Sequence, residues 1–181
     1  NTIANSTAEG IKNNLGSNNT YSGNTLYNNK YGLYITEWYT DYGAVTGISL
    51  QNNIVIAKNN DQNTLYMYFD YNNLQNFGTA NNNYYARPID DNASIYTYQP
   101  STGYVNRTLA SWQSFSGQDA NSHTSPVSIS NVSNLRFEYN ETNSNKIVSL
   151  GSDSYMDVTG TTYTGNITLT PYTSIVLIKT N

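Results

Sequence analysis

The chain has 181 residues, a formal net charge of -4 and no cysteine. The eight Lys and Arg residues do not cluster, which excludes a basic patch for DNA or RNA. The lack of cysteine excludes disulfides, cysteine-based zinc sites and thiol catalysis, and no apolar run is long enough to predict a membrane span. Only 11% of the residues are charged, whereas 18 are tyrosine. Because Tyr and Thr suit half-buried strands and Asn suits turns, the composition predicts an extracellular β protein. Secreted bacterial β proteins often lack disulfides, so the absence of cysteine favours a bacterial protein.

A recurring Asn-Asn step marks the first half of the chain. Pairs begin at Asn28, Asn52 and Asn82, with gaps of 24 (52 − 28) and 30 (82 − 52) residues, and Asn5 lies 23 residues before Asn28. A repeat of about 20 to 30 residues is typical of a solenoid. Asn is favoured at corners that need left-handed backbone geometry, and stacked Asn side chains can hydrogen-bond along a ladder. We therefore expect coils of a parallel β-helix over residues 1–99.

Short β-type runs follow in chain order. The expected strands of the coils are 3–5, 18–27, 32–35, 43–50, 53–57, 65–69, 77–85 and 95–98. Residues 109–113 predict one helical turn, and a polar loop follows it. The expected antiparallel strands of the second part are 127–129, 135–140, 146–150, 155–158, 166–169 and 174–178. Because strands at about ten-residue spacing are typical of a sandwich, we predict β-helix coils with a capping segment over 1–126 and a small Ig-like β-sandwich over 127–181.

Three segments carry a resemblance to a known group of proteins. The run 109–122 resembles a segment found after the last coil of secreted right-handed parallel β-helix proteins, and 76–88 is similar to their final coils. The tail 135–178 is similar to the small β-sandwich that ends many secreted carbohydrate-active proteins. The group is common in Bacteroidota-type bacteria, among polysaccharide lyase and glycoside hydrolase relatives. The resemblance implies an all-β fold, with the last coils of a right-handed parallel β-helix followed by a small antiparallel β-sandwich.

Members of this group are usually several hundred residues long. The resemblance therefore implies that this chain holds the last three or four coils of a longer protein. An uncapped end of a solenoid exposes its core and its strand edges. We expect further N-terminal coils or another protein chain to cover that end, and a secreted or bacterial cell-surface location.

Charged candidates for catalysis are few. Lyases of this fold use a Lys or Arg base, often with Ca²⁺, and polygalacturonase-like hydrolases use clustered Asp, but neither pattern transfers residue by residue. The charged candidates in the coils are Lys58, Arg87, Glu37, Asp41, Asp70, Asp90 and Asp91. The pair Asp90-Asp91 suits either a hard cation or a solvated turn. We expect no metal site or cofactor in this segment, with Ca²⁺ considered only for a longer parent protein, and no catalysis by this segment alone.

The polar loop after the coils holds the only histidine, His123. It suits either a general base or a surface and capping role. Asp119, Asn121 and Ser122 are expected to close backbone hydrogen bonds at the end of the coils. Trp112 is expected to plug the core.

Aromatic residues are dense in the coils. Their flat faces can stack on sugar rings while tyrosine hydroxyls hydrogen-bond to the sugar, or they can simply pack the fold. The loop 36–42 is the best candidate for a binding segment. The predicted carbohydrate-binding residues are Trp38, Tyr39, Tyr42, Tyr84, Tyr85 and Arg87.

Two functions remain open from the sequence. The first is an extracellular or cell-surface carbohydrate-associated protein, the C-terminal portion of a polysaccharide-binding or -degrading protein. The second is a non-catalytic surface adhesin or a structural subunit of a secreted assembly. Low charge and few candidate acids favour a non-catalytic character for these residues.

Overall fold

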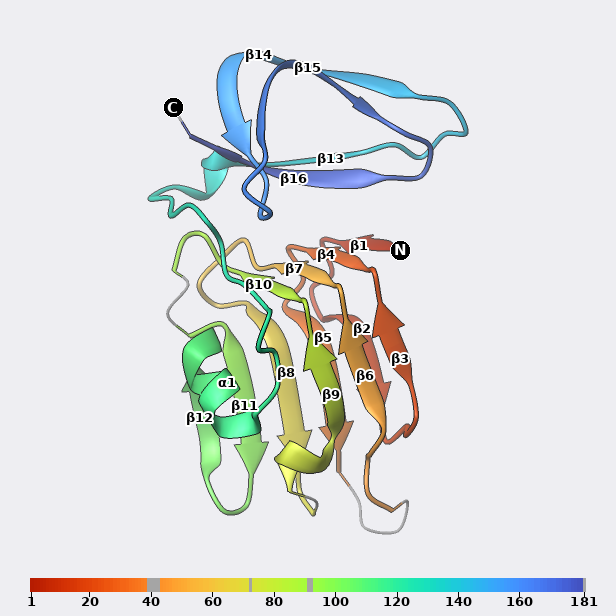
Figure 1. Cartoon of the computed structure of the whole chain (residues 1–181), viewed down its shortest axis with the longest axis vertical. Helices are drawn as coiled ribbons and strands as arrows, with labels where there is room; N and C mark the ends of the chain where they lie inside the picture. Colours follow the sequence, from red (N-terminus) through yellow and green to blue (C-terminus); the bar gives the residue numbers. More distant parts are fainter. Residues whose placement is uncertain (39–42, 72, 91–92, 181) are drawn as a thin grey trace.

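The computed structural model of the chain describes residues 1–38, 43–71, 73–90 and 93–180. Its described strands form four sheets, which we call A to D (Figure 1). Sheet A contains, in spatial order, β1 (Thr2–Ala4), β4 (Thr25–Tyr27), β7 (Ile54–Ile56) and β10 (Tyr84–Ala86). Sheet B contains β12 (Gly103–Arg107), β11 (Ile95–Gln99), β8 (Asn63–Phe69), β5 (Tyr31–Glu37) and β2 (Glu9–Asn14). Sheet C contains β3 (Thr20–Ser22), β6 (Ile48–Gln51) and β9 (Gly78–Asn81), and sheet D contains β13 (Leu135–Tyr139), β16 (Ser174–Lys179), β14 (Lys146–Met156) and β15 (Thr162–Leu169).

Sheets A, B and C are built from parallel pairs, apart from the antiparallel hairpin of β11 and β12 in sheet B. Successive stretches of the chain each supply one strand to a sheet, so equivalent residues lie opposite each other. Leu33 of β5, for example, faces Leu65 of β8, which in turn faces Ile95 of β11. Strand alternation sends these leucine and isoleucine side chains to one face of sheet B and the residues between them to the other.

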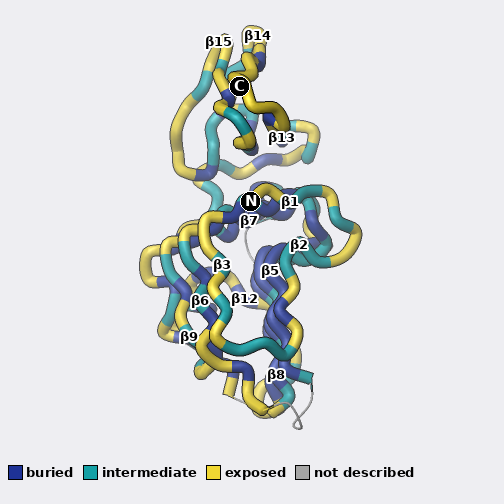
Figure 2. The backbone as a smooth tube through the Cα atoms, turned by 90° about the vertical axis from the view of Figure 1, so that its right-hand side faces the viewer, coloured by how far each residue is buried: buried dark blue, intermediate teal, exposed yellow. Residues whose placement is uncertain are grey.

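The main core lies among sheets A, B and C. Leu26 of sheet A, Leu50 of sheet C and Leu65 of sheet B are each 0% exposed and belong to one apolar cluster. Figure 2 shows the buried residues along β5 and β8 in dark blue. Because residues of three sheets share this cluster, the sheets hold one another in place.

Helix α1 (Leu109–Ser116) covers one end of this core. The side chain of Thr108 accepts a hydrogen bond from the backbone N–H of Ser111 at its start, and Gly117 ends it in the left-handed region with φ +68°. Trp112 is 0% exposed, and its ring centre lies 6.1 Å from that of Phe77. The prediction that Trp112 plugs the core is therefore confirmed. Two short 3-10 helices, Leu74–Asn76 and Val132–Asn134, complete the described helical elements.

A ladder of buried amides runs through the corner between sheets C and A. The side-chain N–H of Asn24 donates to Oδ1 of Asn53 (2.9 Å), and that of Asn53 donates to Oδ1 of Asn83 (3.1 Å). Asn83 donates to Oδ1 of Asp119 (3.0 Å), so the ladder ends on a carboxylate. The expected Asn ladder is confirmed, but Asn24, which follows Gly23, takes the place that the sequence pattern had assigned to Asn29.

The backbone at these corners is left-handed, as the choice of residue predicts. Asn52 and Asn82 have φ of +56° and +55°, and Gly23 occupies the same place with φ +64°. Asn28 belongs to a different corner, where its side chain donates to Oδ1 of Asn5 (2.8 Å) and both residues have positive φ. Asn tolerates this conformation better than most residues with a Cβ, which explains its recurrence.

Sheet D is antiparallel and has two apolar faces. One face carries a cluster of its own that includes Val148, Leu150 and Leu177. The other face packs against sheet A, where Val176 and Ile178 join Tyr27, Ile56 and Ala86 in a second cluster. The rings of Tyr27 and Phe137 stack across this contact, with centres 5.0 Å apart.

The structure confirms that the fold is mainly β, and it corrects the two expected architectures within that class. The expected right-handed solenoid is wrong as stated, because the strands form separate sheets, one of which is antiparallel throughout. The expected Ig-like sandwich is one sheet, D, because its second apolar face is covered by sheet A and not by a further antiparallel sheet. The division of the chain at residue 126 stays a prediction. In the described ranges, no helix has the length and apolar character needed to cross a membrane.

Candidate binding surface

Tyrosines gather on the outer face of sheet B. Leu33 and Ile35 of β5 point into the core, so Tyr34 between them points outward, and the same alternation turns Tyr66 and Tyr68 of β8 outward. We call this surface the aromatic stripe, and it consists of Tyr31, Tyr34, Trp38, Tyr66, Tyr68, Tyr96, Tyr98 and Tyr104.

The rings of the aromatic stripe form two columns that run across the strands. In the first, ring centres of Tyr34 and Tyr66 lie 4.6 Å apart, those of Tyr66 and Tyr96 5.1 Å apart, and those of Tyr96 and Tyr104 5.5 Å apart. These spacings follow the separation of about 4.8 Å between neighbouring strands. The parallel register, which places Tyr34, Tyr66 and Tyr96 opposite one another, therefore creates the column.

The second column lies beside the first. Trp38 stacks on Tyr68 with ring centres 4.2 Å apart, and Tyr68 stacks on Tyr98 at 4.4 Å. Tyr104 of the edge strand β12 lies 4.6 Å from Tyr98 and so joins both columns. Pairs of this kind stabilise by about 0.5–1.5 kcal/mol beyond their buried area, so the columns also pack the fold.

Stacking decides which parts of these rings a ligand could reach. Inside the columns each ring covers its neighbour, which leaves Tyr34 only 7% exposed. Tyr104 lies at the end of both columns and is 58% exposed, so one face of its ring is open. The surface thus offers one open aromatic face, followed by rows of ring edges and phenol hydroxyls. In the described part of the chain, the hydroxyls of Tyr66, Tyr96 and Tyr98 have no protein hydrogen-bond partner that would compete with a ligand.

The charges around the aromatic stripe nearly cancel. Lys12 lies over the Tyr34 ring, with Nζ 5.1 Å from its centre, and forms an ion pair with Glu9 at 3.1 Å. Asp70 lies close enough to the Tyr68 hydroxyl to raise the pKa of that phenol. The guanidinium of Arg107 is turned inward, 3.7 Å from the ring centre of Phe115. An uncharged ligand therefore suits this surface better than a polyanion.

Burial raises the pKa of several phenols of the aromatic stripe. The pKa of Tyr34 and Tyr96 lies above the ordinary value of 10.0, and the pKa of Tyr66 and Tyr68 lies well above it. Loss of hydration is the main cause, and charge on neighbouring phenols or on Asp70 adds to it. These hydroxyls therefore stay protonated, as hydrogen-bond donors, through neutral and mildly alkaline pH.

The same shifts predict how stability depends on pH. The folded state keeps phenol protons that the unfolded chain releases near pH 10, so the stabilisation is complete below about pH 10 and is lost as the pH rises toward the raised values. Tyr27 and Tyr163, whose pKa burial raises to about 12, contribute in the same direction. We expect the free energy of unfolding in urea to fall steadily above about pH 10. A flat profile in that range would show that the phenols are not desolvated as described.

Glu37 anchors the segment that carries Trp38. It is 0% exposed, and its carboxylate accepts hydrogen bonds from the backbone N–H of Val45 (2.6 Å) and of Tyr71 (3.1 Å). Its carbonyl oxygen accepts a further bond from the N–H of Asp70 (3.0 Å). Both carboxylate oxygens of this candidate acid thus accept backbone hydrogen bonds, and Glu37 positions the segment that carries Trp38.

We expect Glu37→Ala to lower the free energy of unfolding by about 2 kcal/mol, because the buried N–H of Val45 and the partly buried N–H of Tyr71 lose their acceptor. Glu37→Gln keeps one acceptor oxygen and should lose less. Urea unfolding of both variants gives the comparison. The assignment fails if the alanine variant is as stable as the wild type.

The structure does not bring the six predicted binding residues together. Trp38 belongs to the aromatic stripe, while Tyr39 and Tyr42 lie outside the described residues. Tyr84 lies on sheet A beside His123, with ring centres 5.4 Å apart. Tyr85 is 0% exposed in the main core, and its hydroxyl lies 3.4 Å from Oδ2 of Asp119.

Arg87, the sixth, is 3% exposed, and its Nη1 donates to the carbonyl oxygens of Gln62 (3.0 Å) and Asn60 (3.3 Å). It therefore holds a loop in place. Asp90 lies 3.5 Å from the Arg87 guanidinium, and Asp91 is outside the described residues. In the ranges that the structure describes, no three acidic or histidine side chains come together as ligands for a metal ion. The expectation about cofactors stays a prediction.

The polar loop caps the amide ladder. The N–H of His123 donates to the carbonyl of Asn83 (2.8 Å), and the N–H of Tyr85 donates to the carbonyl of His123 (2.9 Å). Ser122 accepts a bond from the N–H of Asn83 through Oγ (2.8 Å). These bonds confirm that the loop closes backbone hydrogen bonds.

Most of the aromatic stripe was missed as a site by the sequence analysis. The signal was a Tyr-x-Tyr pattern that recurs at Tyr66 and Tyr96, 30 residues apart (96 − 66), the same distance as Asn53 to Asn83. That shared distance places the tyrosines of successive repeats opposite each other.

Comparison with known proteins finds no match for this chain among family models, curated proteins or solved structures. The resemblance to secreted parallel β-helix proteins of the polysaccharide lyase and glycoside hydrolase group is therefore wrong, and nothing is carried over from that group. Any function has to be argued from the surface itself.

Proposed function

We propose that this chain binds neutral polysaccharides through the aromatic stripe and does not cleave them. The observation that carries the proposal is the pair of tyrosine columns that meet at the open ring face of Tyr104. An aromatic face can pack against the C–H groups of a sugar ring, and phenol hydroxyls beside it can hydrogen-bond to sugar hydroxyls. A hydroxyl-rich polymer is the ligand that uses both features.

The direction of the columns supports a polymeric ligand. They cross the strands of sheet B from β5 to β12, so the same group recurs at every strand, about 4.8 Å apart. A chain of similar sugar units, laid along the columns, would meet equivalent contacts at successive strands. A single small sugar would use only one of them.

Charge and burial support a neutral ligand and a non-catalytic role. Glu9 is paired with Lys12, and Glu37 is buried against backbone N–H groups. Glycoside cleavage by the usual route needs two carboxyl groups about 5–9.5 Å apart around the bond. Besides Glu9 and Glu37, Asp70 is the carboxylate that we place beside the aromatic stripe, close to the Tyr68 hydroxyl.

The location is a proposal as well. A secreted or cell-surface location is where a polysaccharide binder would meet its ligand.

Affinity electrophoresis tests the proposal. The protein is run through gels that contain β-glucan, xylan, mannan, alginate or polygalacturonate, and each polymer is also incubated with the protein and assayed for unsaturated and reducing products. We expect retardation by at least one neutral polymer, none by the two anionic polymers, and no product. Unchanged migration in all neutral gels would contradict the proposal and favour a protein-binding adhesin, and product formation would contradict the non-catalytic role.

A further inference from the structure

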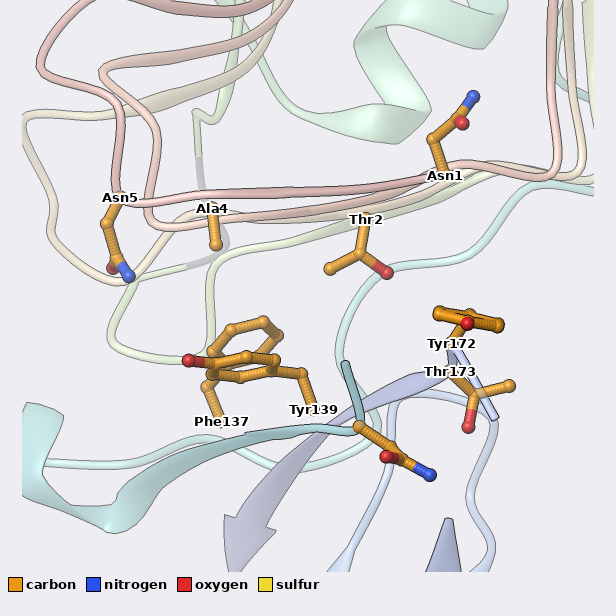
Figure 3. Close-up of a pocket in the computed structure, with 9 residues that line it drawn as sticks. Asn1, Thr2, Ala4, Asn5, Phe137, Tyr139, Tyr172 and Thr173 are labelled. Carbon is orange, nitrogen blue, oxygen red and sulfur yellow. The ribbon is translucent and has the colours of Figure 1, made fainter. Parts of the chain in front are cut away.

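A cavity with aromatic walls lies at the junction of sheets A and D, away from the aromatic stripe. It has a volume of about 530 Å³. Its walls come from β1, from β13 and from the turn before β16 (Figure 3). The residues that line it are Asn1, Thr2, Ala4, Asn5, Phe137, Tyr139, Asn140, Tyr172 and Thr173. None of these side chains is charged, and the volume falls within the range of about 300–1,000 Å³ that is common for ligand sites.

Tyr172 is the unusual residue of this cavity. It has φ of +58°, a left-handed conformation that a residue with a Cβ seldom adopts, and its side chain is 71% exposed. It follows Pro171 in a tight turn closed by the N–H of Thr173, which donates to the carbonyl of Thr170 (3.3 Å). Glycine is the residue that such a turn favours. A tyrosine here strains the backbone without burying its ring, and strain of this kind is concentrated at functional sites.

The opposite wall is firmly held. Tyr139 is 49% exposed and stacks on Phe137 with ring centres 5.7 Å apart, and Phe137 stacks in turn on Tyr27 of sheet A. Figure 3 shows the rings of Phe137 and Tyr139 together on one side and the ring of Tyr172 on the other. Lys146 donates to the carbonyl of Tyr139 (2.8 Å), which fixes the backbone there.

The width of the cavity is fixed as well. The hydroxyls of Thr2 and Ser174 share a hydrogen bond of 2.7 Å that ties β1 to β16. The buried amide of Asn140 donates to the carbonyls of Leu169 (3.0 Å) and Thr170 (3.1 Å) and so anchors the turn that carries Tyr172. A ligand would therefore meet walls that are largely in place, which limits the entropy lost on binding.

We propose that this cavity is a second saccharide site, which holds a neutral sugar between Tyr139 and Tyr172. Two exposed aromatic side chains supply apolar faces, and the amides and hydroxyls of Asn1, Asn5 and Thr173 supply hydrogen bonds. The side chains of the lining are uncharged, which favours a neutral sugar over a uronate. The site uses residues of sheet D and β1, so it does not depend on the aromatic stripe.

Backbone amide chemical shifts, followed while oligosaccharides of cellulose, xylan and mannan are added, test this site in the intact chain. We expect at least one of them to shift the amides of 137–140 and 172–174 along a saturable curve. Tyr172→Gly suits the left-handed turn, so the variant should fold, keep its melting temperature and bind at this site at least tenfold more weakly. Ile147→Ala, which removes a side chain of similar exposure (70%) elsewhere on sheet D, should leave these shifts unchanged.

The outcomes separate the two proposed sites. Chemical-shift changes at the amides of 66–68 and 96–98, with unchanged amides around the cavity, would overturn the second site and still support the aromatic stripe. Unchanged affinity of the Tyr172→Gly variant would overturn the role of Tyr172 and with it the second site. Shifts around the cavity alone would support the second site and contradict the aromatic stripe.

Discussion

Replacing Asp119 with alanine should lower the free energy of unfolding by about 3–5 kcal/mol, the largest loss that we expect from a single substitution. The carboxylate is 1% exposed and ends the amide ladder. Its Oδ2 accepts from Nε1 of Trp112 (2.8 Å), and its Oδ1 accepts from the amide of Asn83 (3.0 Å) and the hydroxyl of Ser122. Alanine would leave these buried donors without an acceptor, each of which costs about 1–3 kcal/mol.

Two control variants make this prediction specific. Asp119→Asn keeps the shape of the side chain and one acceptor oxygen, and asparagine tolerates the φ of +60° at this position, so it should lose less than the alanine variant. Asp61→Ala breaks an exposed ion pair with Lys30 and should cost less than about 1 kcal/mol. Urea unfolding measures all three. A loss below about 1 kcal/mol for Asp119→Ala would show that the ladder does not depend on its carboxylate.

Replacing Tyr104 with alanine should weaken binding of the neutral polysaccharide by about 10- to 100-fold, which corresponds to ~1.4–2.8 kcal/mol. Tyr104 carries the open ring face at the end of both columns. It lies on the edge strand β12 and is 58% exposed, so the variant should still fold, although the loss of two ring pairs should lower its free energy of unfolding by about 1–3 kcal/mol. Loss of binding in a variant that urea unfolding shows to be folded separates a contact residue from one that merely packs the fold.

The Tyr104→Phe variant shows how much of the lost binding free energy comes from ring stacking and how much from the hydroxyl hydrogen bond. Phenylalanine keeps the ring face and removes only the hydroxyl, so it should cost about 0.5–1.5 kcal/mol of binding free energy, the usual contribution of one hydrogen bond. Isothermal titration with the polymer that retards the protein most gives both affinities, and Ile147→Ala serves as the control for exposed apolar area. Equal affinities of wild type and Tyr104→Ala would remove the main support for the aromatic stripe.

The sequence contained enough to predict the β content and the corner residues, but it could not fix the register. Gly23 and Asn52 both tolerate a left-handed backbone, so either can occupy the equivalent corner. For that reason the pair at Asn28 was assigned to a corner where Asn24 actually lies. The true spacing became visible only once hydrogen bonds connected Asn24, Asn53 and Asn83.

The sandwich expected over residues 127–181 differs from the structure for another reason. Alternation showed that its strands have apolar faces, but it could not show what covers them. Tyr27, Ile56 and Ala86 of sheet A supply that cover, and all three lie far away in the sequence. Long-range packing of this kind leaves no local pattern.

The candidate site was predictable only in part. The density of tyrosine indicated an aromatic surface, and Trp38 stacks on Tyr68 within it, while its role in binding stays a prediction. The other chosen residues depended on whether a side chain points inward or outward, which alternation fixes only when the register is known. Tyr85 was expected at the surface and is buried, whereas Tyr104 was overlooked and is the most exposed ring of the aromatic stripe.

The central claim is that a neutral glycan lies along the aromatic stripe, and nuclear Overhauser contacts between sugar protons and tyrosine ring protons test it most directly. The measurement uses the full chain with labelled tyrosine and an oligosaccharide of the polymer that binds best. We predict contacts from the sugar to the ring of Tyr104 and to the ring edges of Tyr96 and Tyr98. Contacts confined to tyrosines outside the aromatic stripe, at ligand concentrations that saturate binding, would contradict the account.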